Sequence, residues 1–164
     1  MKTRFLLLPF IFLLISCTQS QDSSEFNRLG LEEITLTELQ ERYETGDLST
    51  RRVVQAYLDR IEAVDKRGPA LNSVLTINPN ALDIADRLDR ERQDGNIRGP
   101  LHGVPVLLKD NIDTGDMPTT AGSFFLEGSI PPDDAFIVSK LRQAGAVILG
   151  KTNLSEWANF HSSF

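Results

Sequence analysis

The sequence predicts an α/β fold in which helices flank a β-sheet. Residues 104–108 and 146–149 are short apolar runs that contain Val or Ile, as is typical of buried strands. A segment with a helical pattern begins after Pro131 and separates the two runs. A strand, a crossover helix and a second strand in this order indicate a parallel pair within an α/β sheet.

The chain before these strands is expected to be mostly helical. Thr35 opens a capping box and predicts a helix that ends at Gly46. Ser49 or Thr50 can cap a second helix, which should end near Lys66. Apolar residues recur along it at helical spacing, which indicates a face packed in a core. These residues are Val53, Val54, Tyr57, Leu58, Ile61 and Val64.

Strands, helices and one long connection are expected to alternate in the rest of the chain. Residues 74–77 should form a short strand, followed by a helix with Pro79 at its first position, where proline is tolerated. Residues 110–130 contain many turn formers and no helical period, so we expect a long loop. Asn153 is expected to begin a last helix.

Large apolar residues of the later helices are expected to belong to the core. The helix between the two apolar strands should pack through Phe136, Val138 and Leu141. Trp157 and Phe160 share helical spacing, and we expect a core position for both in preference to a substrate-binding role.

Composition excludes several classes of function. The 164 residues carry a net charge of −6 and form no cluster of Lys and Arg, which argues against a nucleic-acid partner. Two histidines and one cysteine are too few for a zinc site built from Cys and His ligands. We expect His102 to be a hydrogen-bonded loop residue and His161 a surface residue.

The N-terminal segment has the features of an export signal. Lys2 and Arg4 precede an apolar run at residues 5–15, which is shorter than the about 20 residues that cross a membrane. Residues 14–17 (LISC) resemble the lipobox of bacterial lipoproteins, in which the cysteine is lipidated and becomes the new N-terminus. This resemblance implies lipidation at Cys17 and an exported, membrane-anchored lipoprotein that faces the periplasm or the cell surface.

Three blocks in the second half of the chain resemble the amidase-signature family. They are residues 99–112 (GPLHGVPVLLKDNI), 119–123 (TTAGS) and 150–158 (GKTNLSEWA), and they occur in the order and spacing of the family. The resemblance runs from about Thr35 onward and is greatest to peptide amidases and bacterial amidases. It implies a mixed β-sheet flanked by helices, of which this chain would hold a part.

The resemblance also implies a Ser–cis-Ser–Lys triad that hydrolyses carboxamide bonds, in small amides or at the C-terminal amide of peptides. Lys109 matches the catalytic lysine. Thr120, Ala121, Gly122 and Ser123 match a loop that borders the active site, and the family places both serines of the triad later. Because the segments that carry these serines do not occur in the sequence, we expect the 164-residue chain to be an inactive fragment. No metal or organic cofactor is implied.

The catalytic role requires surroundings that keep Lys109 uncharged. A lysine that acts as a base near neutral pH must be uncharged, which burial in apolar surroundings favours. We therefore expect Lys109 to be buried. A neighbouring carboxylate would favour the charged amine, so we expect the Asp110 side chain to point away from Lys109, as alternation along a strand allows.

Two other functions compete with an amidase. Residues 145–152 (GAVILGKT) satisfy the P-loop pattern of nucleotide-binding proteins. Their middle residues favour a strand over a phosphate-binding loop, and we expect Lys151 to be structural or exposed. The second alternative is a non-catalytic lipoprotein remnant that kept part of an amidase scaffold.

These observations divide the chain into three parts. Residues 1–16 are expected to be a signal peptide, and residues 17–30 a lipid-anchored tether rich in polar residues. Residues 31–164 are expected to be the N-terminal portion of an amidase domain, which is incomplete. The expected partners are an amide substrate and, through the lipid, a membrane; the oligomeric state is left open.

Overall fold

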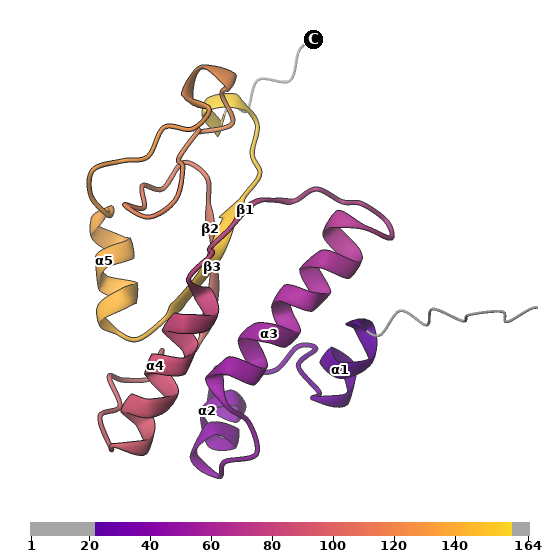
Figure 1. The fold of residues 1–164 in the computed structure, drawn as a ribbon, viewed down its shortest axis with the longest axis vertical. Helices are drawn as coiled ribbons and strands as arrows, with labels where there is room; N and C mark the ends of the chain where they lie inside the picture. Colours follow the sequence, from indigo (N-terminus) through magenta and orange to yellow (C-terminus); the bar gives the residue numbers. More distant parts are fainter. Residues whose placement is uncertain (1–21, 159–164) are drawn as a thin grey trace, which may run out of the picture.

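The computed structural model describes residues 22–158 of the chain as a three-stranded sheet with helices packed on both faces (Figure 1). The helices are α1 (Asp22–Arg28), α2 (Leu36–Glu44), α3 (Thr50–Arg60), α4 (Ala81–Gln93) and α5 (Phe136–Gln143). The strands are β1 (Val74–Ile77), β2 (Pro105–Lys109) and β3 (Val147–Thr152). Shorter elements are the π-helix Ile61–Lys66 and the 3-10 helices Phe124–Leu126 and Glu156–Ala158.

The central strand of the sheet is β3, which pairs with β1 antiparallel and with β2 parallel. α5 connects β2 to β3, as a parallel pair requires. The predicted α/β class and the mixed sheet are therefore confirmed. β2 was expected to be buried, but it lies at an edge of the described sheet, and only Leu108 among its residues is buried.

A register shift between β2 and β3 determines which side chains of β3 share a face. Val106 lies opposite Ile148, whereas Leu108 lies opposite Lys151, so β3 holds one extra residue between these pairs. Strict alternation from Ile148 would have placed Lys151 on the other face. The shift instead brings Lys151 to the face that Leu108 and Ile148 share.

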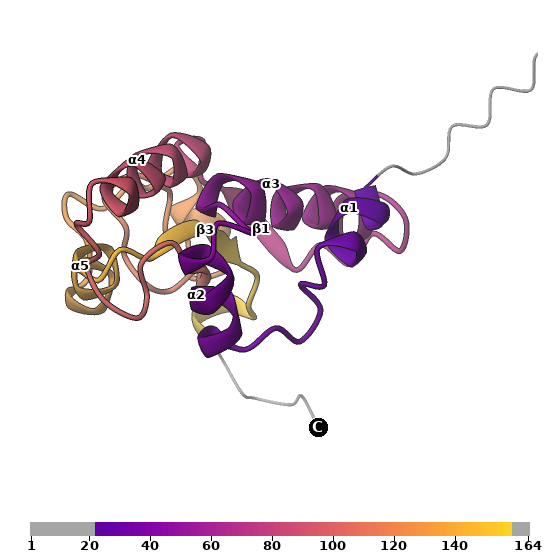
Figure 2. The same ribbon diagram turned by 90° about the horizontal axis from the view of Figure 1, so that it is seen from below.

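Separate apolar clusters cover the two faces of the sheet. On one face, α3 and α4 pack against Val147 and Leu149, and Figure 2 shows these two helices together on one side of the sheet. On the other face, α5 inserts Val138 into a cluster with Leu108 and Ile148. Burial on both faces explains why 146–149 is a continuous apolar run.

The capping signals of α2 and α3 are confirmed. The Thr35 hydroxyl accepts a hydrogen bond from the Glu38 N–H at 3.2 Å, and the Ser49 hydroxyl accepts one from the Arg52 N–H at 3.2 Å. After α3 the helix continues with π geometry to Lys66, the expected end point.

α4 begins later than the proline pattern indicated. Asn80 is the N-cap, so Pro79 precedes the helix and does not occupy its first position. Asn78 closes the preceding turn, because its Oδ1 accepts from the Asn80 N–H at 2.9 Å. The Asn78 amide group also donates to the Ile148 carbonyl at 2.8 Å, which ties the start of α4 to β3.

The predicted tether at residues 17–30 is wrong from Asp22 onward. Residues 22–28 form α1, and Phe26 is buried against α3. The Phe26 and Tyr57 rings meet edge to face with centroids 5.1 Å apart, and the Arg60 guanidinium lies 4.4 Å from the Phe26 centroid. A single aromatic residue in a polar segment has no periodicity, so only its packing partner reveals that the segment is folded.

Two predicted core residues are exposed. Phe136 is 78% exposed, whereas Val138 is fully buried. Residues two apart on a helix differ by about 200° in direction, so these two side chains cannot share a face. Trp157 is 64% exposed, because the expected last helix is only a 3-10 turn in which Trp157 has a φ of 55°. Phe160 and His161 lie outside the described residues.

Asp65 anchors the loop between the π-helix and β1. Its carboxylate accepts hydrogen bonds from the N–H and hydroxyl of Ser73 and from the N–H of Val74, and it lies 3.3 Å from the Lys66 ammonium. Burial raises the pKa of Asp65, but these donors outweigh it and lower the pKa to about 2. The carboxylate is therefore a structural element of this loop.

Within residues 22–158, no helix is long and apolar enough to cross a membrane. The same residues contain no group of three or more His, Cys, Asp or Glu side chains placed to hold a metal ion.

Candidate active site

Lys109 is the last residue of β2, at the edge where the parallel strands β2 and β3 have their carboxyl ends. Open α/β sheets place ligands at this edge. Lys109 is exposed, so the burial expected of it is not provided by the described residues. The reason is that β2 lies at an edge and Lys109 alternates with Leu108, whose side chain faces the α5 cluster.

Asp110 follows Lys109 and is buried, with 1% of its surface exposed. Its carboxylate Oδ1 lies 3.3 Å from the ammonium nitrogen of Lys151. Oδ2 accepts hydrogen bonds from the N–H, at 3.0 Å, and the hydroxyl of Thr120. The Asp110 carboxylate is thus directed to Lys151 and Thr120, and this agrees with its expected orientation away from Lys109.

Residues 119–123 (the 119–123 loop) lie directly over the end of β2. Ala121 donates its N–H to the Asp110 carbonyl at 2.9 Å and accepts from the Trp157 N–H at 2.7 Å. These bonds hold Ala121 at a φ of 50°, a left-handed conformation that is strained for a residue with a side chain. Such strain often lies at functional sites.

Gly122 is required by close packing as well as by its φ of 70°. A Cβ at Gly122 would lie 2.8 Å from the Leu154 carbonyl oxygen. Ser123 is buried and donates its hydroxyl to Glu156 Oε1 at 2.7 Å. This contact gives Ser123 a structural role in joining the 119–123 loop to the segment after β3.

A cavity of about 360 Å³ opens at this edge of the sheet. It is bounded by β1, the end of β2, the 119–123 loop and the segment after β3. Its lining includes Thr76, Asp110, Thr120, Gly122, Ser123 and Asn153. Three of the four loop residues predicted to border an active site therefore line one cavity, whereas Lys109 is not among its lining residues.

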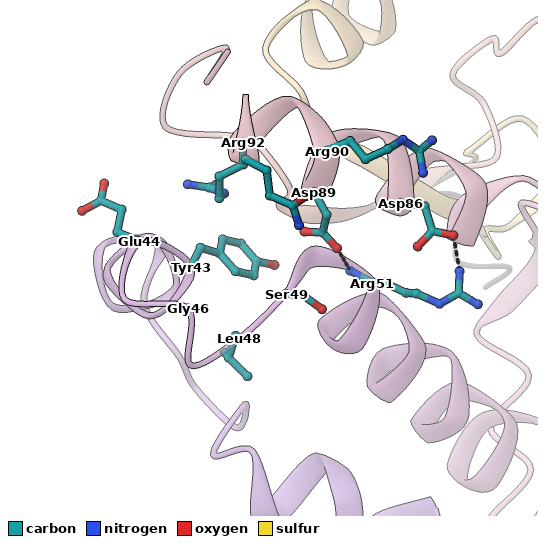
Figure 3. Close-up of a pocket in the computed structure, with 11 residues that line it drawn as sticks. Tyr43, Glu44, Gly46, Leu48, Ser49, Arg51, Asp86, Asp89, Arg90 and Arg92 are labelled. Atoms are coloured by element: carbon teal, nitrogen blue, oxygen red, sulfur yellow. Dashed lines mark hydrogen bonds and ion pairs between the residues drawn. The ribbon is translucent and has the colours of Figure 1, made fainter. Parts of the chain in front are cut away.

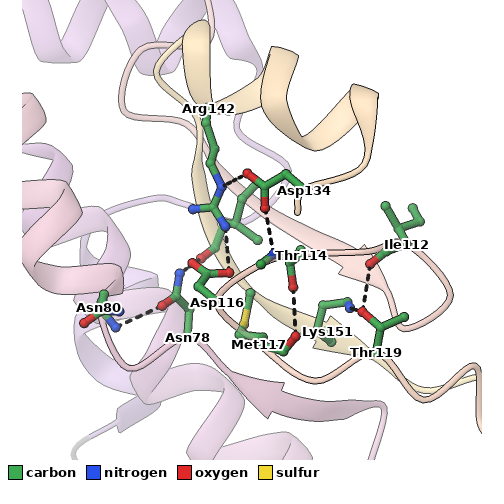
Figure 4. A network of polar contacts seen from close by, with 12 residues as sticks. Asn78, Asn80, Ile112, Thr114, Asp116, Met117, Thr119, Asp134, Arg142 and Lys151 are labelled. Carbon is green, nitrogen blue, oxygen red and sulfur yellow. Dashed lines mark hydrogen bonds and ion pairs between the residues drawn. The ribbon is translucent and has the colours of Figure 1, made fainter. Parts of the chain in front are cut away.

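Lys151 is the residue of this region whose place the sequence did not reveal. It is fully buried in β3, and its ammonium donates to Thr119 Oγ1 at 2.8 Å (Figure 4). It also donates to the Pro118 carbonyl at 3.2 Å. Burial lowers the pKa of Lys151, while the Asp110 carboxylate acts in the opposite direction. Of the two expected roles, structural or exposed, the structure supports the structural one.

The same contacts contradict nucleotide binding through residues 145–152. Most of this segment is β3, a strand, whereas a P-loop is an open loop whose N–H groups surround phosphate. A Cβ at Gly150 would lie 2.1 Å from the Thr76 carbonyl oxygen, so this glycine permits close pairing with β1. With Lys151 buried as well, no phosphate-binding group of the pattern is available.

A second cavity, of about 630 Å³, lies between α2 and α4 (Figure 3). Asp89 accepts hydrogen bonds from the backbone N–H groups of Thr50 and Arg51 at the start of α3. Asp86 forms an ion pair with Arg51 at 2.5 Å. These charges hold α3 to α4, and none of the predicted site residues lines this cavity.

The remaining predicted residues are placed as follows. His102 is fully buried, accepts from the Arg98 N–H at Nδ1, and has Nε2 at 2.9 Å from the Leu88 carbonyl oxygen. The prediction of a hydrogen-bonded loop residue is confirmed. Cys17 lies outside the described residues.

Comparison with known proteins gives consistent matches over most of the chain. The Amidase family matches residues 52–163. A predicted amidase of Schizosaccharomyces pombe is 50% identical over 136 residues, which cover 82% of this chain and 23% of the yeast protein.

Two solved structures share the fold. The native peptide amidase of Stenotrophomonas maltophilia superimposes with a TM-score of 0.78 at 55% identity, over 80% of this chain and 27% of that protein. An amidase family protein of Bacillus anthracis gives a TM-score of 0.80 at 40% identity, over 90% and 29% of the two chains. The chain spans about a quarter of the length of the relatives it matches. Its sequence and its fold together show that the chain belongs to the amidase family.

Proposed function

We propose that this chain contributes the catalytic lysine, Lys109, to the active site of an amidase. The amidase hydrolyses carboxamide C–N bonds by a Ser–cis-Ser–Lys mechanism in which Lys109 is the base. The observation that carries the proposal is the position of Lys109. It ends β2 at the carboxyl edge of the sheet, immediately before Asp110, which holds the 119–123 loop. The loop and Lys109 belong to two of the three blocks that resemble amidases.

In this mechanism the uncharged Lys109 amine accepts a proton from a bridging serine, which in turn accepts the proton of the nucleophilic serine. The nucleophile attacks the amide carbonyl, the proton returns from Lys109 through the bridging serine to the leaving nitrogen, and ammonia or an amine departs. Water then hydrolyses the acyl-enzyme. Both serines are assigned to parts of an amidase that this sequence does not match. The substrates are linear carboxamides or C-terminal peptide amides, which is supported by the likeness to a peptide amidase.

The exposed position of Lys109 indicates that a complete site needs a further segment to cover β2. Leu107 shares its face of β2 and is 38% exposed, and β2 has no partner on its outer edge among the described residues. An unpaired edge with exposed apolar side chains is a surface that proteins normally cover. We assign this cover to the remainder of a complete amidase domain, which would also exclude water from Lys109.

A chimera tests the proposal. Residues 22–158 would replace the matching segment of the Stenotrophomonas maltophilia peptide amidase, and ammonia release from a C-terminal peptide amide would be measured. We expect the chimera to be active and Lys109→Ala to reduce kcat by about 10³-fold, as for loss of a general base. Lys140→Ala, which removes an exposed lysine of α5, is the control and should retain full activity.

Two results would contradict the proposal. An unchanged rate of ammonia release in Lys109→Ala would show that Lys109 is not the base. A folded but inactive chimera with intact Lys109 would instead support the non-catalytic remnant. The 164-residue chain by itself is expected to release no ammonia in the same assay.

We also propose that the chain is exported and lipidated at Cys17. The support is the sequence pattern of residues 2–17. Expression in a bacterial host with labelled palmitate should label the wild-type protein and place it in the membrane fraction. Cys17→Ser should lose the label, and label retained by this variant would refute lipidation at Cys17.

A further inference from the structure

Lys151 is a buried charged residue that the proposed mechanism does not use. Its ammonium nitrogen has three oxygen neighbours within 3.3 Å: Thr119 Oγ1, the Pro118 carbonyl and Asp110 Oδ1. Figure 4 shows the contact with Thr119. An ammonium in the interior is costly unless such groups surround it, so its presence fixes the positions of all three.

Each of these neighbours belongs to the polypeptide around the candidate site. Pro118 precedes the 119–123 loop and Thr119 is the first residue of it. The Thr119 hydroxyl also donates to the Ile112 carbonyl at 3.4 Å (Figure 4). Asp110 holds the N–H and hydroxyl of Thr120 through its second carboxylate oxygen. Lys151 therefore contacts both the start of the loop and the side chain that holds its centre.

Backbone hydrogen bonds connect the contacts of Lys151 to the residues next to Lys109. The Asp110 N–H donates to the Thr152 carbonyl at 3.0 Å, and the Ile112 N–H donates to the Lys109 carbonyl at 3.0 Å. The Ala121 N–H donates to the Asp110 carbonyl. The strand end that presents Lys109 and the strained loop beside it thus share one hydrogen-bonded unit around the Lys151 ammonium.

We propose that Lys151 is a positioning residue of the amidase site, whose buried ammonium fixes Asp110 and Thr119 and so holds the 119–123 loop beside Lys109. This role rests on the proposed function, since it names what aligns the same site. Lys151 is distinct from the base, because its amine is buried against Asp110, Pro118 and Thr119, whereas Lys109 is exposed.

The test measures amide hydrogen exchange by NMR in the 164-residue chain and needs no substrate. Lys151→Met keeps the length and apolar volume of the side chain but removes the ammonium. We expect exchange of the Thr120 and Ala121 amides to become at least about tenfold faster, because both amides donate to Asp110. Amides of α3 and α4 should change less than twofold, and Lys140→Met is the matched control.

Chemical rescue separates positioning from space filling. In a Cys17→Ser background, Lys151→Cys would be alkylated with 2-bromoethylamine in denaturant and refolded, which restores an amine at nearly the lysine length. The Thr120 and Ala121 exchange rates should return to within about threefold of the parent. If Lys151→Met fails to fold, Thr119→Val removes one hydroxyl partner with little change in volume, and it should speed exchange in the 119–123 loop alone.

Unchanged exchange in the loop, or equal acceleration in the loop and in α3 and α4, would overturn the proposal, because Lys151 would then contribute only to global stability. Neither result depends on catalysis. An inactive chimera would count against the amidase proposal and leave the exchange result standing, whereas unchanged loop exchange would leave the Lys109 test standing.

Discussion

Gly150→Ala is expected to reduce the free energy of unfolding by about 3 kcal/mol, the upper part of the usual range for overpacking. A Cβ at Gly150 would lie 2.1 Å from the Thr76 carbonyl oxygen and 3.2 Å from the Ile77 Cα, both backbone atoms of β1. Backbone cannot move aside as a flexible side chain can, so β1 must separate from β3. The midpoint of thermal unfolding should fall by roughly 6–12 °C.

Gly115→Ala is the matched control for this experiment. The nearest atoms to a Cβ at Gly115 lie 3.7 Å away, at an ordinary contact distance. Its free energy of unfolding should stay within about 0.5 kcal/mol of the parent. Equal stability of the two variants, measured by circular dichroism on heating, would show that β1 and β3 are not paired as described.

Asp110→Asn is expected to reduce the free energy of unfolding at pH 7 by about 3 kcal/mol, since it leaves a buried ammonium without its counter-charge. The asparagine oxygen can still accept from the Thr120 N–H, so the loss comes mainly from Lys151. Replacing both partners, as Asp110→Asn with Lys151→Met, should recover part of this loss, because no buried charge then remains.

The pH dependence of Asp110→Asn identifies the ammonium as the cause. Burial lowers the folded-state pKa of Lys151 below its unfolded value, so between the two values the unfolded chain binds more protons and stability rises with pH. Asp110 opposes this shift, as do Asp113 and Asp116 more weakly. Without the Asp110 charge, the rise in stability should begin at lower pH than in the parent.

Urea unfolding between pH 6 and pH 10 measures both effects. Glu62→Gln is the control, because it removes an exposed ion pair with Arg67 at 2.7 Å and should cost less than about 0.5 kcal/mol. If Asp110→Asn lost no more stability than Glu62→Gln and showed the same pH profile as the parent, the buried ion pair would not contribute to the fold.

Local signals in the sequence were sufficient for most helices and strands. Thr35 and Ser49 cap their helices through their own side chains, and Val74–Ile77 forms the expected strand. These features depend on neighbours a few residues away, which the sequence displays directly. Two errors are local, since Phe136 and Val138 cannot share a face of α5 and Pro79 precedes α4. Other errors fall on residues whose environment comes from distant segments. Phe26 packs on Tyr57. Trp157 lies in a strained turn and donates its N–H to the Ala121 carbonyl.

In the candidate site, too, some residues were predicted from sequence motifs, whereas the position of another became known only from the structure. The three sequence blocks identified the family, and they predict Lys109 and the 119–123 loop as site residues. The burial of Lys151 could not be read from the chain, because alternation from Ile148 places it on the opposite face.

By itself, the sequence determined the α/β class, the capped helices and the relationship to amidases. Each of these follows from local periodicity or from contiguous motifs. Only the tertiary structure decided that Lys151 lies in the interior beside Asp110 and that Gly150 permits close strand pairing. It also decided that Lys109 lies at a sheet edge that no segment within residues 22–158 pairs with. The physical reason is that strand register and the covering of a sheet edge depend on which segments meet in space, and a one-residue shift between β2 and β3 reverses the face to which a side chain points.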